Sequence, residues 1–322
     1  MIAEVAGMPV ARQYDSAQLS ACLLVRVLLL IALAGFALPL PAQDLEPRSY
    51  SNAPVGMNFL IAGYGYAQGG LATDPSLPIE NAELEIHSAL TAYARALNVL
   101  GKSAKVDAIV PYAWLSGSGE YEGDLRERDV SGFGDPRLRF SMNFFGAPAL
   151  SMKEFGRYRQ DLIFGGSIQL FLPLGQYDPD RLVNIGTNRW AIRPELGVSK
   201  AWGHWTFEGT AGVKLHADND DFFGGNLREQ DPIYSLQVHV VYSFPRGIWL
   251  ALDGTYYFGG RATVNGVERD DLQKNSRLGA TLAWPVSRSH SLKLHASTGT
   301  TVRTGTDFDA IALVWQYRWG GE

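Results

Sequence analysis

Cysteine is almost absent from this chain, because Cys22 is the only one among its 322 residues. The string Leu19-Ser20-Ala21-Cys22 has the form of a lipoprotein cleavage box, but no apolar run precedes it, so an ordinary cysteine is the favoured interpretation. If the chain is cut after Ala42, as argued next, the mature protein has no thiol. That excludes disulfides and thiolate-bound metals, and we expect neither a metal site nor a cofactor.

Long apolar runs are also missing, with one exception at residues 27–38. Arg26 precedes this block and Pro39-Leu40-Pro41-Ala42 follows it, which is the layout of a secretory signal peptide. The block is too short for a membrane-spanning helix, which needs roughly 20 apolar residues. We therefore predict a signal peptide over residues 1–42, cleaved after Ala42, and one mature domain over residues 43–322.

A strong excess of one charge is lacking as well. The formal net charge is −5, and no basic stripe argues for a nucleic-acid partner. A mean hydropathy of −0.07 excludes a helical membrane protein but not a β-barrel, whose strands have one apolar and one polar face. No phosphate-binding loop is present, and Gly63-Tyr64-Gly65 is not followed by a helical pattern, so this chain would not power transport.

What the chain does contain is glycine, aromatic residues and alternation: 35 Gly, 14 Tyr, 15 Phe and 8 Trp favour one β-rich unit. The clearest alternation lies in 308–319, because residues two apart share one face of a strand. One face carries Ile311, Leu313, Trp315, Tyr317 and Trp319, and the other carries Ala312, Gln316 and Arg318. Such a strand fits lipid on one side and a polar lumen on the other.

Twelve segments show this pattern, and aromatic residues cluster near their ends, as they do at membrane interfaces. The segments are 57–67, 87–98, 103–115, 132–145, 160–172, 189–202, 204–217, 231–243, 247–259, 274–285, 289–301 and 308–319. The predicted fold class is all-β: a membrane-spanning antiparallel up-and-down β-barrel of about 12 strands, with both termini in the periplasm.

The connections support this topology, because short turns alternate with long polar loops such as 116–131 and 218–230. Two connections break the rule. The segment 146–159 is long where a turn is needed, and we expect a small helix within Ala149–Tyr158; the loop at Thr304–Thr306 is short. Since the first strand begins soon after the cleavage site, we expect no N-terminal plug domain.

Six groups of short strings then occur in order along the chain. They are Ser131-Gly132-Phe133-Gly134-Asp135-Pro136-Arg137-Leu138, Gly146-Ala147-Pro148-Ala149-Leu150, Asn184-Ile185-Gly186-Thr187-Asn188-Arg189-Trp190, Arg193-Pro194-Glu195-Leu196-Gly197-Val198, Tyr256-Tyr257-Phe258-Gly259-Gly260 with Val264-Asn265-Gly266, and Ser297-Thr298-Gly299 with Gly305-Thr306-Asp307-Phe308. Over roughly residues 55–319 they resemble the outer-membrane β-barrel family of transporters named for the phenol-degradation meta-pathway. The resemblance implies an outer-membrane location and uptake of aromatic or other hydrophobic compounds. Such barrels usually finish on an aromatic residue, whereas here Gly320-Gly321-Glu322 follow Trp319.

The face predicted to line the lumen is basic. Our candidates for the solute path are Arg137, Arg139, Arg189, Arg193, Glu195, Glu208, Lys214, His239, Asp253, Arg277, Lys293, His295 and Arg318, and the same face would carry Arg95, Lys105, Asp107 and Arg303. Two interpretations stay open. Either the charges pair across strands and fill a narrow barrel, or a positive surplus favours anions such as aromatic carboxylates. A one-residue error in assigning faces would remove the inference.

An enzymatic alternative rests on His295 and Ser297, which lie two apart on one strand face. The spacing resembles that of the outer-membrane phospholipase, a twelve-stranded barrel whose pair faces lipid and whose histidine is oriented by an asparagine. Here the pair shares its face with Lys293, and the analogous third position holds Asp309. A nucleophile needs a base and a group that orients the base, so we expect no enzyme. The loop Asp218-Asn219-Asp220-Asp221 lacks the glycine and bidentate glutamate of a calcium loop.

The predicted function is therefore an outer-membrane channel for passive uptake of small hydrophobic or aromatic compounds, anions among them. The alternatives are a closed structural or interaction barrel that works through its outer loops, and a lipid hydrolase. The expected partners are outer-membrane lipid, the barrel-insertion machinery and the small-molecule solute. Neither a particular solute nor an oligomeric state follows from these residues.

Overall fold

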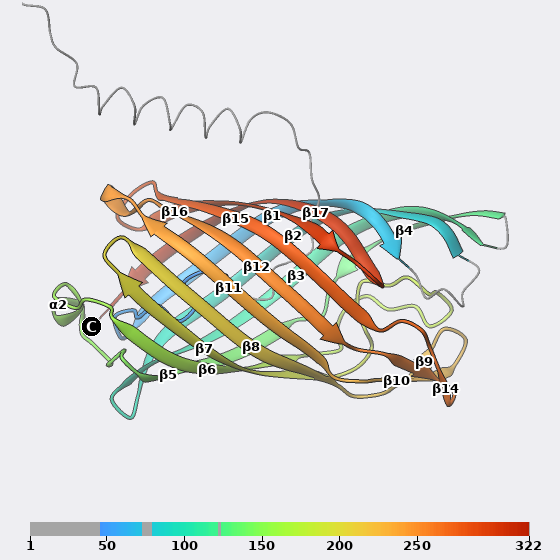
Figure 1. Ribbon diagram of the computed structural model, residues 1–322, viewed down its shortest axis with the longest axis horizontal. Helices are drawn as coiled ribbons and strands as arrows, with labels where there is room; N and C mark the ends of the chain where they lie inside the picture. The colour runs from blue at the N-terminus through green and yellow to red at the C-terminus, as the bar shows by residue number, and fades with distance from the viewer. Residues whose placement is uncertain (1–45, 73–78, 122–123, 322) are drawn as a thin grey trace, which may run out of the picture. The chain divides into compact units, whose positions relative to one another are not determined.

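The computed structural model describes residues 46–72, 79–121 and 124–321, and these form one antiparallel barrel (Figure 1). The predicted signal peptide, residues 1–42, lies outside the described residues. Among the described residues, none of the helices has the length and apolar character needed to cross a membrane.

The wall of the barrel is a 13-stranded sheet. Its strands are β1 (Met57–Ala72), β2 (Ile79–Val99), β3 (Lys102–Tyr121), β4 (Asp124–Phe133), β5 (Arg137–Phe145), β6 (Leu162–Phe171), β7 (Ala191–Trp202), β8 (Trp205–His216), β11 (Ile233–Ser243), β12 (Trp249–Gly259), β15 (Gln273–Pro285), β16 (His290–Thr301) and β17 (Gly305–Gly320). The sheet closes because β1 pairs with both β2 and β17, and β2 pairs with β3. β4 and β5 both pair with β3 and follow one another along it, so together they occupy one strand position. The 13 strands therefore make a 12-stranded barrel. The predicted antiparallel β-barrel of about 12 strands is confirmed.

The interruption between β4 and β5 falls at Gly134-Asp135-Pro136. It lies beside Pro111 of β3, which has no N–H to contribute to the ladder. The Gly134 N–H donates to the Pro111 carbonyl at 2.9 Å, which holds the two strands together across the break. Beyond the break, β4 pairs only with β3, whereas β5 pairs with both β3 and β6. The free edge of β4 is therefore available to a loop.

The segment 116–131 was predicted to be a loop, and this is wrong. β3 continues to Tyr121 and β4 begins at Asp124, so most of the segment is a hairpin. The pattern was missed because both faces carry charged residues: Arg128 faces inward with Leu115 and Val130, while Glu127 and Leu125 face outward. A strand with a charged outer face does not lie in the hydrocarbon of a membrane.

On β7, β11, β12 and β15 the outer face between the ends of the strands is apolar and exposed. Examples are Leu196, Leu236, Val238, Leu252 and Leu278. On the same strands the inward residues Glu195, Gln237, His239 and Asp253 are buried. This arrangement, apolar outside and polar inside, is that of a barrel in lipid, because an exposed apolar belt of this extent is not stable in water.

Two residues predicted to face the lumen do not. Arg95 is exposed on the outer face of β2 opposite Asn58, whereas its neighbours Ala94 and Ala96 face inward. The alanines of β2 gave too little contrast to fix which face is which. Arg303 lies in the connection from β16 to β17, where it pairs with Asp270 at 2.7 Å.

The two ends of the barrel differ, and we name them by their connections. The turn end carries the short connections at 100–101, 203–204, 286–289 and the 3₁₀ turn η1 (Pro245–Gly247). It also carries the C-terminal residues and α2 (Met152–Phe155), which confirms the predicted helix and is capped by Ser151 (Figure 1). The loop end carries residues 172–190 and a second sheet of β9 (Asn219–Phe222), β10 (Asn226–Gln230), β13 (Ala262–Val264) and β14 (Val267–Glu268).

The exposed leucines supply a test of which surface contacts lipid. Leu196 is 66% exposed in the middle of β7, and Leu100 is 91% exposed in a turn. Leu196→Arg should lower the free energy of unfolding by about 2–4 kcal/mol, as arginine does near the bilayer midplane. Leu100→Arg should leave it nearly unchanged. Denaturant titration in lipid vesicles, followed by tryptophan fluorescence, measures both, and equal effects would contradict the assignment.

Candidate functional site

The lumen has two unlike walls. On one side, the adjacent strands β17, β1 and β2 present almost only small or apolar side chains inward. We call this set the apolar stripe: Phe59, Ile61, Gly63, Gly65, Ala67, Leu90, Ala92, Ala94, Ala96, Phe308, Ala310, Ala312 and Val314. Most members of the stripe are alanine or glycine and none is charged; Gln316 and Arg318 follow it on the inner face of β17 at the turn end.

The opposite wall, from β3 through β5 and round to β16, is polar and contains most of the predicted solute-path residues. Arg189, Arg193, Glu195, Glu208, His239, Asp253 and His295 are buried, Arg137, Arg139, Lys214, Arg277 and Lys293 are partly buried, and Arg318 is exposed at the turn end. All but Arg189 and Arg318 lie on strands of this wall; Arg318 is on β17 and Arg189 is in the connection before β7. That these residues contact a solute stays a prediction.

Several charges of this wall pair with one another. Arg193 Nη2 lies 3.1 Å from Glu195 Oε2, and both side chains are almost completely buried. Arg139 Nε donates to Asp107 Oδ2 at 2.9 Å between adjacent strands. These contacts support the interpretation that charges pair across the lumen face, although they involve only part of the set.

A hydrogen-bonded chain crosses four strands of the same wall. His239 Nδ1 lies 2.6 Å from Asp253 Oδ1, and the Thr281 hydroxyl joins Asp253 (3.1 Å) to His295 Nδ1 (3.0 Å). Unlike the hydrolase arrangement considered from the sequence, His295 is held by this threonine. Asp309 lies on the outer face of β17, where the Thr298 hydroxyl donates to it. The three groups of the hydrolase hypothesis are therefore not assembled.

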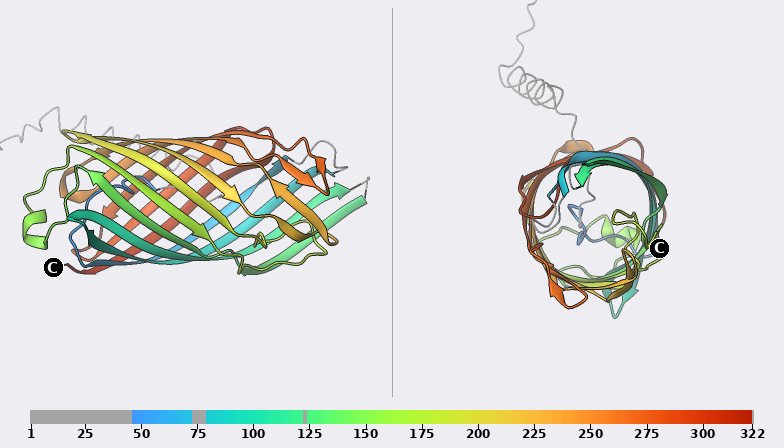
Figure 2. Two further views of the ribbon diagram at one scale, coloured as in Figure 1. Left: turned by 90° about the horizontal axis from the view of Figure 1, so that it is seen from below. Right: turned by 90° about the vertical axis from the view of Figure 1, so that its right-hand side faces the viewer.

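Residues 46–56, which we call the inner segment, lie inside the barrel at the turn end; in the end-on view of Figure 2 this blue start of the chain is within the ring of strands. The sequence led us to expect no N-terminal plug domain, and the inner segment is too short to be a domain, but its position inside the barrel was not foreseen. Its backbone is held by the wall: the Arg48 N–H donates to Glu208 Oε2 at 2.6 Å, and Lys105 donates to the Ser49 carbonyl.

Tyr50 is the anchor of the inner segment and is only 3% exposed. Its hydroxyl donates to Glu195 Oε1 at 3.2 Å, and its carbonyl accepts from Asn143 at 3.0 Å. The ring lies over Gly165 and Gly197, which are paired across β6 and β7. A side-chain Cβ at Gly165 would come within 2.6 Å of the ring, and one at Gly197 would overlap it. The two glycines form the recess that holds Tyr50.

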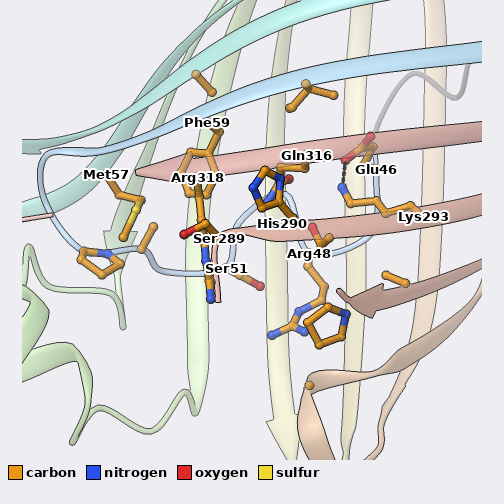
Figure 3. Close-up of a pocket in the computed structure, with 18 of the residues that line it drawn as sticks. Glu46, Arg48, Ser51, Met57, Phe59, Ser289, His290, Lys293, Gln316 and Arg318 are labelled. Atoms are coloured by element: carbon orange, nitrogen blue, oxygen red, sulfur yellow. Dashed lines mark hydrogen bonds and ion pairs between the residues drawn. The ribbon is translucent and has the colours of Figure 1, made fainter. Parts of the chain in front are cut away.

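The inner segment and the turn-end strands enclose a cavity of about 1170 Å³ (Figure 3). Phe59 and Ile61 of the apolar stripe line one side, and Lys105, Arg139 and Lys293 line the other. Lys293 Nζ lies 2.7 Å from Glu46 Oε2, the interaction drawn as a dashed line. The cavity thus brings an apolar surface and several cations together, a combination suited to an amphipathic anion.

Glu46, Arg48 and Tyr50 were missed from the sequence because they precede the first strand and show no alternation. A signal was present in Gly165 and Gly197, two lumen-facing glycines on neighbouring strands. Such a pair leaves a recess that another part of the chain can fill.

The comparisons with known proteins agree with this architecture. The family model described as "Putative MetA-pathway of phenol degradation" matches residues 74–315. The COG4313 outer membrane channel from Pseudomonas putida F1 superposes with a TM-score of 0.74 at 21% identity, covering 86% of this chain and 100% of that one. The transport unit of the autotransporter AIDA-I from Escherichia coli gives 0.49 at 7% identity, covering 86% and 93%. No curated protein matches.

The recess for Tyr50 predicts how the inner segment can be displaced. Gly197→Ala should push the ring away and raise the single-channel conductance in planar bilayers, because the anchor would no longer fit. Gly209→Ala is the matched control: its added Cβ would meet nothing closer than Val198 at 3.7 Å. Equal conductance in the two variants would argue against the anchor.

The contact between Glu46 and Lys293 predicts a pH dependence. The Lys293 ammonium lowers the pKa of the Glu46 carboxyl below its ordinary value, against the opposing effect of burial. A lowered pKa stabilises the docked segment above the carboxyl's ordinary pKa, and this stabilisation is lost as the pH falls through the lowered value. Conductance should therefore rise in acid below about pH 4. Glu46→Gln should already have the higher conductance at pH 7 and no such acid step; a retained step would assign it to another group.

Proposed function

Since the chain belongs to the family described as the MetA-pathway of phenol degradation and has the fold of an outer-membrane channel, we propose that it conducts small hydrophobic or aromatic compounds, their anions included, by passive diffusion. The observation that carries the proposal is the pairing of an apolar stripe with a charged wall along one lumen. Such a lumen accommodates a solute with an apolar body and a polar group, each against the wall that suits it.

The apolar stripe is suited to passage because it is made of small residues. Ala92, Ala96 and Ala310 have short side chains that are buried among their neighbours, whereas Phe59, Ile61 and Ala94 line the cavity at the turn end. An apolar surface in contact with water favours adsorption of an apolar solute, at about 25 cal/mol per Å² removed from water. A shallow and continuous attraction permits a solute to enter and also to leave.

The proposal includes a topology. The signal peptide is removed after Ala42, the barrel-insertion machinery places the barrel in the outer membrane, and both termini lie in the periplasm. The turn end then faces the periplasm and the loop end faces outward, as short turns and long loops do in bacterial barrels. The inner segment becomes a constriction on the periplasmic side that a solute must pass or displace.

A second candidate function rests on the same segment. If Tyr50 never leaves its recess, the barrel is closed and works as a structural or interaction protein through its loop end. Swelling of proteoliposomes made with refolded protein separates the two: absence of flux for every small solute would favour the closed barrel.

The apolar stripe predicts selectivity for an aromatic ring. Phenylalanine and serine have the same charges, and the proposal requires faster entry of phenylalanine than diffusion size alone allows. Ile61→Asn, in the cavity, should lower the ratio of phenylalanine to serine flux about fivefold, which corresponds to about 1 kcal/mol of lost apolar contact. Ser291 lines the same cavity from β16, and Ser291→Asn is the matched control, because it places the same side chain in the cavity without removing apolar surface. An unchanged ratio of phenylalanine to serine flux in Ile61→Asn would show that the apolar stripe does not select aromatic solutes.

A further inference from the structure

The connection between β6 and β7, residues 172–190, folds against the inner side of the wall at the loop end. A Cβ at Gly132 would come within 2.6 Å of the Gln176 side chain, and one at Gly134 would lie 3.6 Å from Ile185. Gly132 faces inward, because it pairs with Ala113 beside the inward pair Leu115 and Val130. The connection therefore covers the free edge of β4 from within the mouth of the barrel.

Asp135, in the interruption between β4 and β5, accepts hydrogen bonds from residues near both ends of this connection. Its Oδ1 accepts from the Gly175 N–H at 3.0 Å, and its Oδ2 accepts from the Thr187 N–H at 2.9 Å and the Thr187 hydroxyl at 2.6 Å. Asn219 of β9 braces the other side by donating to the Tyr177 hydroxyl at 2.9 Å and to the Thr187 carbonyl at 3.3 Å. The position of the residues that follow Thr187 is thus fixed from two directions.

Arg189 is the charged residue that this brace positions. It is 7% exposed; one guanidinium nitrogen donates to Gln230 of β10, and the other, Nη1, is buried without a hydrogen-bond partner. Among the residues that the structure describes, no carboxylate oxygen lies within 4.0 Å of this guanidinium. A buried arginine remains charged, because its proton cannot be removed under ordinary conditions, so its unsatisfied N–H groups require an acceptor.

A second arginine and a histidine lie near Arg189. Arg228 lies two residues before Gln230 on β10, with its guanidinium 5.0 Å from the centre of the Phe222 ring. His216, which pairs with Ala191, faces the same mouth with its Nδ1 buried and without a partner. Burial, together with the charge of Arg228, lowers the pKa of Arg189 to about 10, and burial likewise lowers the pKa of Arg228. Both stay cationic at neutral pH.

Acidic groups near this cluster do not occupy it. Asp135 is engaged by Gly175 and Thr187, and Asp271 accepts from the Ala262 N–H at 2.8 Å. Asp218 is exposed at the start of the loop beyond His216 and acts on Arg189 only from a distance. The cluster therefore offers directed donors to an anion that comes from outside the chain.

We propose that Arg189, Arg228 and His216 form a binding site at the loop end for the carboxylate of a small aromatic or similarly amphipathic acid. The planar guanidinium of Arg189 matches a carboxylate, and the Phe222 ring beneath Arg228 offers an apolar surface to the body of the same solute. The site deepens the proposed function, on which it rests, because it selects the anionic members of the solute class where they would enter.

Calorimetric titration of the folded full-length mature barrel in detergent tests the site without requiring flux. Benzoate should bind wild type, while acetate, which lacks the ring, and benzamide, which lacks the charge, should bind more weakly. Arg189→Gln should weaken benzoate binding about tenfold or more, as loss of a charge-assisted hydrogen bond does. Arg189→Lys should restore part of it. Arg303→Gln is the matched control, since Arg303 is a solvated arginine at the same end that pairs with Asp270.

The outcomes separate the site from the channel. Benzoate binding that is equal in wild type and Arg189→Gln, with both barrels folded by heat-modifiable gel mobility, overturns the site. Acetate binding as tight as benzoate, and equally sensitive to Arg189, overturns its aromatic part. Arg189-dependent benzoate binding without any solute flux in proteoliposomes leaves the site standing and removes the proposed channel function. Solute flux without any Arg189-dependent benzoate binding overturns the site and leaves the proposed channel function standing.

Discussion

No backbone N–H or C=O can remain unpaired in hydrocarbon, and the rest of this structure follows from that constraint. It forces the sheet to close, so β1 must pair with both β2 and β17. Closure gives every strand an outer face for lipid and an inner face that is free to be polar. At the interruption Gly134-Asp135-Pro136 the backbone finds other partners: the Gly134 N–H donates to the Pro111 carbonyl, and the Phe133 and Pro136 carbonyls accept from the N–H groups of Gln176 and Leu172.

Closure at 12 strands creates a second constraint, which concerns the charged groups of the lumen. The lumen is too wide to be filled by side chains alone, but too narrow for bulk water to hydrate every charge. Part of the inner wall solves this by pairing within itself, as Arg139 does with Asp107. Other groups of the wall are paired with a segment that is not a strand. The inner segment brings Glu46 to Lys293 and the Tyr50 hydroxyl to Glu195. Both partners lie outside the alternating pattern, so irregular chain shapes the turn end of the lumen, as residues 172–190 shape the loop end.

This division explains what could be predicted from the sequence. Strands with one face toward lipid show period-two alternation in the sequence. All strands that cross the membrane were located from this alternation. It also predicted that Arg193 and Glu208 face inward. Prediction failed where the alternation is weak: in the alanines around Arg95, and in the hairpin of β3 and β4, which has charged residues on both faces. It also failed for Tyr50, because nothing in the periodicity of a short segment says that its partner is a pair of glycines on two later strands.

The short strings that carry the family resemblance have a physical reading in the same terms. Two of them, one containing Gly132 to Pro136 and one containing Asn184 to Trp190, are far apart in sequence but join at Asp135. Each residue type is required there: glycine at 132 because Gln176 occupies the space of a side chain, aspartate at 135 because two backbone donors converge on it, and proline at 136 because the strand must stop pairing. A motif of this kind describes a junction between a wall and a loop rather than a chemistry. The motif therefore identifies the architecture but not the solute. Selection of the solute depends instead on Arg189, the residue that this junction positions in the lumen.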